Sequence, residues 1–192
     1  MSSETPSTLS TDAFGDTLLR IARNAIGERF AFPAQAVADF AELGEAAATF
    51  VTLTQQGQLR GCIGSLEAHR PLARDVAANA LAAAFHDPRF RPLGKDEFVR
   101  TRVEVSLLTP AEPFPVRDEA DALARLRPLV DGLILSYRGR RATFLPQVWE
   151  SLRAPGDFLA QLKLKAGLPA DFWHADIVLA RYAVRKWHEA AG

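Results

Sequence analysis

The sequence predicts an α+β fold built on antiparallel sheets. The expected strands are joined as hairpins or across single helices, whereas a parallel sheet needs a regular alternation of strands and helices. The chain has 192 residues, 48% of them hydrophobic, which is enough for one substantial core and a smaller lobe beside it.

Two helices are expected in the first 45 residues. Residues 11–30 carry an apolar face at helical spacing, and Thr11 or Asp12 can cap its start. That face consists of Leu18, Ile21, Ala22 and Ala25. Residues 34–43, AQAVADFAEL, predict a shorter second helix that ends at Gly44.

A β-hairpin and a third helix follow. The β-rich run at 50–53 and the run LRGCIG at 59–64 flank the turn sequence QQGQ, as in a hairpin. Pro71 suits the first turn of a helix, which is expected to end near His86 because Pro88 follows. The predicted buried stripe of this helix is Leu72, Val76, Ala80 and Ala83.

The second half of the chain predicts four strands and three short helices. Residues 98–109 alternate as a strand, and the proline-rich stretch after them reads as a loop. A helix over 117–130 is expected next, then a hairpin over 132–145 that turns at Arg138–Arg140. Helical segments at 145–152 and 154–168 precede a late strand over 176–189.

Composition narrows the function classes. Lys plus Arg equals Asp plus Glu, at 23 each, so the basic excess of a nucleic-acid-binding protein is missing. No apolar stretch approaches the length of a membrane span, and residues 1–11 predict a disordered tail rather than a secretory signal. A single cysteine cannot form an intramolecular disulfide, which predicts a cytoplasmic protein.

The motif LRGCIG makes Cys62 the first candidate site residue. Glycines inside a strand are costly, so Gly61 and Gly64 predict a close approach to the backbone by a ligand or another segment. Residues two apart share a strand face, so Arg60 is expected beside the thiol, where it would favour the thiolate and activate a nucleophile. The alternative is that Cys62 is a small buried apolar residue.

Four polar residues are candidates for a role near Cys62. His69 is the nearest candidate base, and Glu104 is a candidate acid or base that could also pair with Arg60. Asp87 and Arg89 are expected about 22 Å away, at the far end of the intervening helix, where they would cap, pair or bind elsewhere. No metal-ligand or nucleotide-binding spacing is present, so no metal or cofactor is predicted.

The chain resembles the AMMECR domain family, the A component of the bacterial set called AmmeMemoRadiSam. The resemblance spans roughly residues 14 to 187 and rests on motifs in the family's order. These are LRGCIG, EAHRPLARDVAANALAAAFHDPRF, VEVSLLTP, DGLIL, FLPQVW and LKAGLPADFW. It implies one domain over 12–188 with two lobes: a larger antiparallel sheet flanked by helices, formed from both ends of the chain, and a smaller lobe with a short antiparallel sheet.

The resemblance also implies a cleft at the hallmark motif and a set of family-like positions. Beyond the motif itself, this set comprises Asp87, Pro88, Arg89, Phe90, Glu104, Leu145, Pro146 and Gln147. Many relatives carry a second cysteine before KAGLP, which this chain lacks, so a two-thiol mechanism is not expected. Memo-like and radical SAM proteins are the implied partners.

Three functions follow as hypotheses. Because no complete catalytic set can be identified, the sequence favours a component that binds a partner or an unknown small ligand in the cleft around LRGCIG. The alternative is an enzyme that acts on a small metabolite or acyl group through Cys62. A thiol redox sensor is the third hypothesis, and it would need an external thiol.

Overall fold

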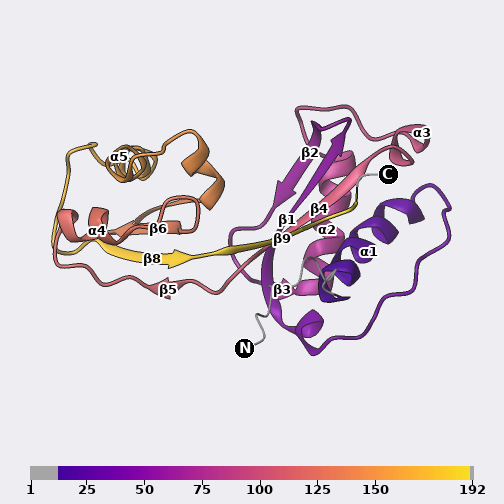
Figure 1. Ribbon diagram of the computed structural model, residues 1–192, viewed down its shortest axis with the longest axis horizontal. Coiled ribbons are helices and arrows are strands. Elements are labelled where there is room, and N and C mark those ends of the chain that lie inside the picture. The colour runs from indigo at the N-terminus through magenta and orange to yellow at the C-terminus, as the bar shows by residue number, and fades with distance from the viewer. Residues whose placement is uncertain (1–12, 191–192) are drawn as a thin grey trace, which may run out of the picture. The chain divides into compact units, whose positions relative to one another are not determined.

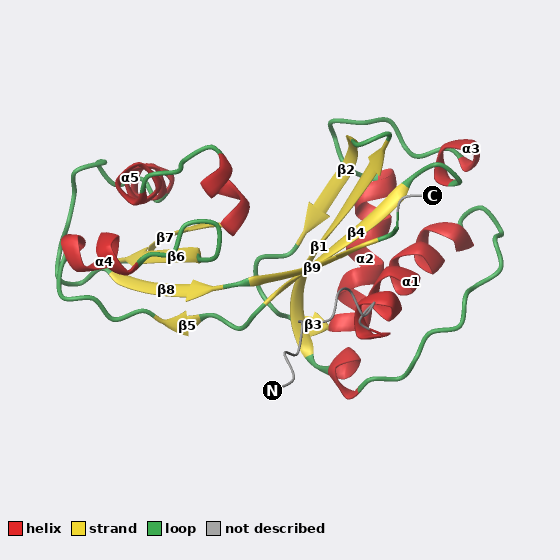
Figure 2. Cartoon of the chain, viewed as in Figure 1, coloured by secondary structure: helices red, strands yellow, loops and turns green. Residues whose placement is uncertain are grey.

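The computed structural model describes residues 13–190, and these form the predicted α+β fold with two antiparallel sheets (Figure 2). The described chain divides into two compact units. Unit 1 comprises the described residues up to Leu107 together with those from Arg185 onward, and unit 2 is Leu108–Val184. The predicted tail and the capping residues Thr11 and Asp12 lie outside the described residues.

Unit 1 is a sheet covered by helices. Its strand order is β2-β1-β4-β9, with the short β3 paired to β1 (Figure 1). Helix α2 packs on β1 and β2, and α1 packs on α2, which buries the predicted stripe of α2. The strands are β1 (Ala46–Gln55), β2 (Gln58–Gly64), β3 (Arg70–Pro71), β4 (Arg102–Leu108) and β9 (Val184–His188). The helices are α1 (Ala13–Glu28), α2 (Leu72–Phe85), α3 (Lys95–Phe98) and a 3-10 turn, η1 (Ala41–Gly44).

The helix predicted over 34–43 is wrong, since only the turn η1 forms there. Side chains of α1 satisfy the backbone of this segment instead. Asn24 bonds both the N–H and the carbonyl of Gln35, and Arg20 donates to the Ala36 carbonyl. The apolar periodicity was therefore misleading, and Val37 is 46% exposed.

The hairpin of β1 and β2 is confirmed, and it contains a β-bulge that matters for the site. Leu53 pairs with Gly61, but Thr54 pairs with Leu59, so Arg60 is the extra residue on β2. A bulge breaks the two-residue alternation of side chains and re-aims the residue within it.

Unit 2 is a smaller sheet, of order β5-β8-β6-β7, with α5 against β7 and α4 against α5. The predicted second hairpin is confirmed as β6 and β7. The predicted late strand is two strands, β8 in this sheet and β9 in unit 1, and the proline-rich stretch contributes the unpredicted β5. The elements are β5 (Glu112–Pro113), α4 (Glu119–Arg125), β6 (Gly132–Tyr137), β7 (Arg140–Phe144), η2 (Pro146–Glu150), α5 (Pro155–Lys165) and β8 (Val178–Tyr182).

Candidate functional site

The glycines of LRGCIG let the protein's own atoms approach β2. A Cβ at Gly61 would overlap the carbonyl oxygen of Ala83, so the last turns of α2 rest directly on the strand. A Cβ at Gly64 would overlap the Phe50 ring and the Thr49 carbonyl. The predicted close approach is therefore present at both positions, but the approaching groups belong to unit 1 and not to a ligand.

This packing brings Asp87 to Cys62. Asp87 Oδ2 accepts a hydrogen bond from the Cys62 backbone N–H at 2.9 Å, and Arg89 Nη2 donates to the Cys62 carbonyl at 3.3 Å. The expectation that Asp87 and Arg89 lie about 22 Å from the motif is wrong. That distance was the length of the helix from its first residue. Helix α2 instead runs back over β2, so its last residues lie beside the middle of the strand.

Asp87 and Arg89 form a clamp on the peptide groups of Cys62. Arg89 donates through Nε at 3.0 Å and Nη2 at 2.7 Å to the two carboxylate oxygens, and its backbone N–H adds a bond at 3.1 Å. The side chain of Asp87 is 1% exposed and that of Arg89 is 54% exposed. The Arg89 side chain, helped by the Cys62 and Arg89 N–H groups, holds the pKa of Asp87 well below its usual range against the effect of burial.

The thiol of Cys62 is half-buried, and a hydroxyl is its only hydrogen-bond partner in residues 13–190. Thr52 Oγ1 donates to Sγ at 3.3 Å. No hydrogen bond or ion pair of the described chain joins Cys62 to His69, which is exposed. Glu104 lies 3.9 Å from Lys186, so its predicted pairing with Arg60 is wrong. No hydrogen bond or ion pair within residues 13–190 supports an acid–base role for His69 or Glu104 at Cys62.

Arg60 makes no hydrogen bond with the Cys62 thiol. The β-bulge directs its side chain to the carboxylate of Glu97 instead. Its Nε and Nη2 donate to Glu97 Oε1 at 3.3 Å and Oε2 at 3.1 Å, and Nη2 also donates to the Arg91 carbonyl at 3.0 Å. The Arg60 hydrogen bonds, with the Gly94 N–H, lower the pKa of Glu97 to about 2. The cation at Cys62 is Arg89, whose hydrogen bonds to Asp87 are the main cause of its raised pKa and whose Nη2 donates to the Cys62 carbonyl.

Phe90 connects the two arginines. The guanidinium of Arg60 lies 5.8 Å and that of Arg89 5.5 Å from the Phe90 ring centroid, within cation–π range. We call Cys62, Arg89 and Phe90 the thiol surface. Arg89 Nη1 makes no hydrogen bond within the described chain, so the thiol surface offers donors for an anion beside an aromatic ring.

A buried polar network fixes the other end of β2, and sequence reasoning missed it. Asp75 is fully buried and accepts hydrogen bonds from Thr49, Ser65, Arg70 and Asn79 at 2.6 to 3.0 Å. The sequence did contain a signal for this network. Asp75 and Asn79 are polar residues four apart on the strand-facing side of a mostly apolar helix, and buried polar groups need hydrogen-bond partners. The network ties β1, β3 and Ser65, the residue that directly follows β2, to the first turns of α2.

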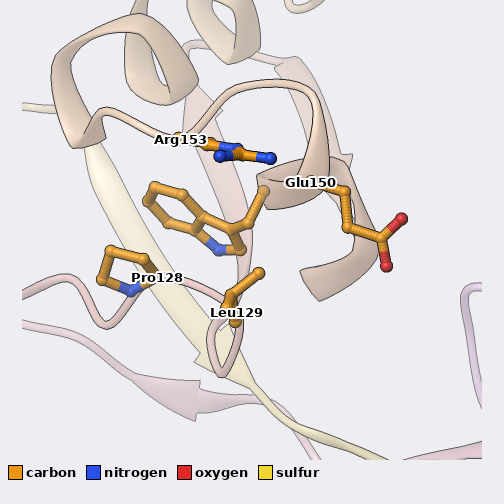
Figure 3. Close-up of a pocket in the computed structure, with 5 residues that line it drawn as sticks. Pro128, Leu129, Glu150 and Arg153 are labelled. Atoms are coloured by element: carbon orange, nitrogen blue, oxygen red, sulfur yellow. The ribbon is translucent and has the colours of Figure 1, made fainter.

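The remaining candidate, Gln147, is exposed on η2 in unit 2. The same unit has a hollow of about 440 Å³ lined by Pro128, Leu129, Trp149, Glu150 and Arg153. Figure 3 shows Glu150 directed away from the other labelled side chains. None of the predicted site residues lines this hollow.

Residues 13–190 contain no group of three or more His, Cys, Asp or Glu suited to a metal ion, and no helix long and apolar enough to cross a membrane.

The fold and site define a class: a two-unit α+β protein in which an Asp–Arg pair that follows a helix holds the backbone of a cysteine in a glycine-containing strand. The family model AMMECR1 matches residues 19–187, so the chain belongs to the AMMECR1 family, as its motifs indicated.

Relatives cover nearly the same length. A protein of Methanothermobacter thermautotrophicus is 38% identical over 91% of this chain and 94% of its own length. A protein of Aeropyrum pernix is 36% identical over 93% of this chain and 80% of its own. The crystal structure of the uncharacterized protein PH0010 from Pyrococcus horikoshii is similar, with a TM-score of 0.75, 33% identity and 93% of each chain covered.

Proposed function

We propose that this chain is a cytoplasmic binding component of a pathway that also uses Memo-like and radical SAM proteins, and that it binds a partner or ligand through the thiol surface. One observation carries the proposal. Within residues 13–190, the half-exposed guanidinium of Arg89 keeps Nη1 without a hydrogen bond, beside a thiol that no acid or base hydrogen-bonds. The resemblance to the A component of AmmeMemoRadiSam supports the choice of partners.

The chemistry of the thiol surface favours a carboxylate. Asp87 occupies the Nε–Nη2 edge of Arg89, so the Nη1 donors are left to hold one further acceptor. The Phe90 ring offers an apolar contact next to that acceptor. An acidic side chain on an extended segment of a partner fits both features.

Calorimetric titration with the Memo-like and radical SAM proteins of the same organism tests this proposal. Arg89→Gln should weaken binding at least about tenfold, because a charge-assisted hydrogen bond is lost, whereas Cys62→Ser should leave the affinity nearly unchanged. Arg127→Gln is the matched control, since Arg127 is also a half-exposed arginine, 57% exposed, on a buried aspartate, Asp131. Unchanged binding by Arg89→Gln, or its loss in a folded Cys62→Ser protein, would refute the proposal.

The alternative function is acyl transfer through Cys62, whose half-buried thiol has the cationic Arg89 beside its peptide group. Sγ would attack a thioester carbonyl, form an enzyme thioester and release the original thiol, with the Cys62 proton passing to that thiol. Mass spectrometry after incubation with an acetyl thioester decides the matter. A Cys62 acetyl adduct that forms quickly in the wild type and slowly in Arg89→Gln supports the enzyme, and an unmodified Cys62 rejects it.

A further inference from the structure

We infer that unit 1 has a second binding site, separate from the thiol surface, which takes a small carboxylate-bearing molecule. The site is a hollow of about 270 Å³ at the turn end of the β1–β2 hairpin. Neither Cys62 nor Arg89 lines it. Its lining residues are Gln55, Gln56, Gln58, Leu59, Arg60 and Arg100.

The unmet donors of Arg60 point to a ligand. The Arg60 side chain is 10% exposed, and its Nη1 is the one buried side-chain nitrogen or oxygen in residues 13–190 that lacks a hydrogen-bond partner. The guanidinium is planar, and Glu97 occupies its Nε–Nη2 edge, so Nη1 is directed away from that carboxylate. Buried polar groups are almost always satisfied, and an orphaned one calls for a missing partner.

The charges around the hollow favour an anion. Glu97 is shared by Arg60 and by Arg91, whose Nη2 lies 3.6 Å from Oε1, and the exposed Arg100 lines the hollow as well. These are three cations and one carboxylate, so the surplus of positive charge favours an anion. A carboxylate carries its charge on two coplanar oxygens, which match the planar guanidinium of Arg60.

The glutamines supply the rest of the recognition. The Gln55 amide nitrogen donates to Thr101 Oγ1 at 2.9 Å, which orients that side chain. Gln56 and Gln58 are exposed and make no side-chain hydrogen bond within the described chain, so their amides are free for polar groups of a ligand. Leu59, 44% exposed, offers an apolar contact. A short carboxylic acid that enters the hollow would reach Nη1 once the Gln58 and Arg100 side chains rearrange around it.

Chemical-shift titration of the ¹⁵N-labelled chain with acetate, glutarate and inorganic phosphate at constant ionic strength tests the inference. Acetate and glutarate should give saturable shifts of the backbone amides at 55–60, and phosphate should bind more weakly. Arg60→Lys keeps the positive charge near Glu97 but removes Nη1, so it should weaken glutarate binding at least about tenfold. Arg100→Ala should weaken binding several-fold, and Arg102→Ala, an exposed arginine outside the hollow, should not change it.

Shifts that never saturate, equal affinity in folded Arg60→Lys, or tighter binding of phosphate than of both carboxylates would overturn the site. If Arg60→Lys does not fold, Gln58→Ala and Arg100→Ala decide, because both residues are exposed and their substitution leaves the Arg60–Glu97 pair intact. Full glutarate affinity in both variants would then reject the inference.

Discussion

Replacing Asp87 with alanine should release the strand that carries the thiol. Asp87 accepts four hydrogen bonds, one from the Cys62 N–H at 2.9 Å and three from Arg89. In Asp87→Ala the Cys62 N–H is left without an acceptor next to the end of α2. The Arg89 side chain, 54% exposed, is free to turn into water.

The free-energy cost of the substitution is the sum of two contributions, one from the Cys62 N–H and one from the Arg89 side chain. A buried N–H that loses a charged acceptor costs about 1 to 3 kcal/mol. The Arg89 side of the clamp is half-exposed and therefore contributes only about 0 to 1 kcal/mol. The sum is about 1 to 4 kcal/mol, which corresponds to an increase of about fivefold to several hundred-fold in the opening equilibrium at this strand.

Hydrogen exchange of the Cys62 amide measures this opening directly. Under conditions where exchange follows the opening equilibrium, the rate in Asp87→Ala should rise by that factor. The control is Asp176→Ala, which removes a carboxylate that is 56% exposed and pairs with Arg138 at 3.1 Å, and it should leave the Cys62 rate unchanged. A Cys62 rate in Asp87→Ala that matches the wild type would refute the clamp.

Three further outcomes are expected. Gly61→Ala should lower the free energy of unfolding by about 1 to 3 kcal/mol in urea denaturation, because its Cβ meets the α2 backbone, while Gly44→Ala, with open space around it, should be nearly neutral. Asp75→Ala should cost about 3 to 5 kcal/mol by the same assay, since it strands the buried partners of a fully buried carboxylate, and a loss below 1 kcal/mol would contradict the network. In an acid titration, the stability contributed by the lowered pKa values of Asp87 and Glu97 should be complete above about pH 5. It should decline as the pH falls through the unfolded-state pKa values of about 4 toward the folded-state values, about 2 for Glu97. Asp87→Asn should make that decline shallower, and an identical slope would count against the Asp87 contribution.

The elements that the sequence predicted correctly are those set by local chemistry. The turn at Gln56–Gly57, where both residues have positive φ, and the β-rich runs beside it predict the first hairpin. The stripe of α2 is periodic because one face is buried. The helix over 34–43 fails because its backbone is satisfied by side chains of α1, which are distant in sequence and invisible to periodicity.

The site could be located from the sequence, but its contacts could not. The two glycines correctly predicted close approach, yet nothing local indicates that Ala83 makes it at Gly61. Arg60 was placed beside the thiol by strict alternation, which the bulge breaks. Asp87 was placed far away by distance along a helix, although the direction in which that helix packs determines its distance in space.

A map of chemical-shift changes on partner binding shows whether the thiol surface is the binding site. When the Memo-like or radical SAM protein is titrated into the ¹⁵N-labelled chain, the largest backbone amide shifts should fall at Cys62, Arg89 and Phe90, and the map should persist in Cys62→Ser. Binding that leaves these three amides unchanged, or no binding by either partner, would contradict the account.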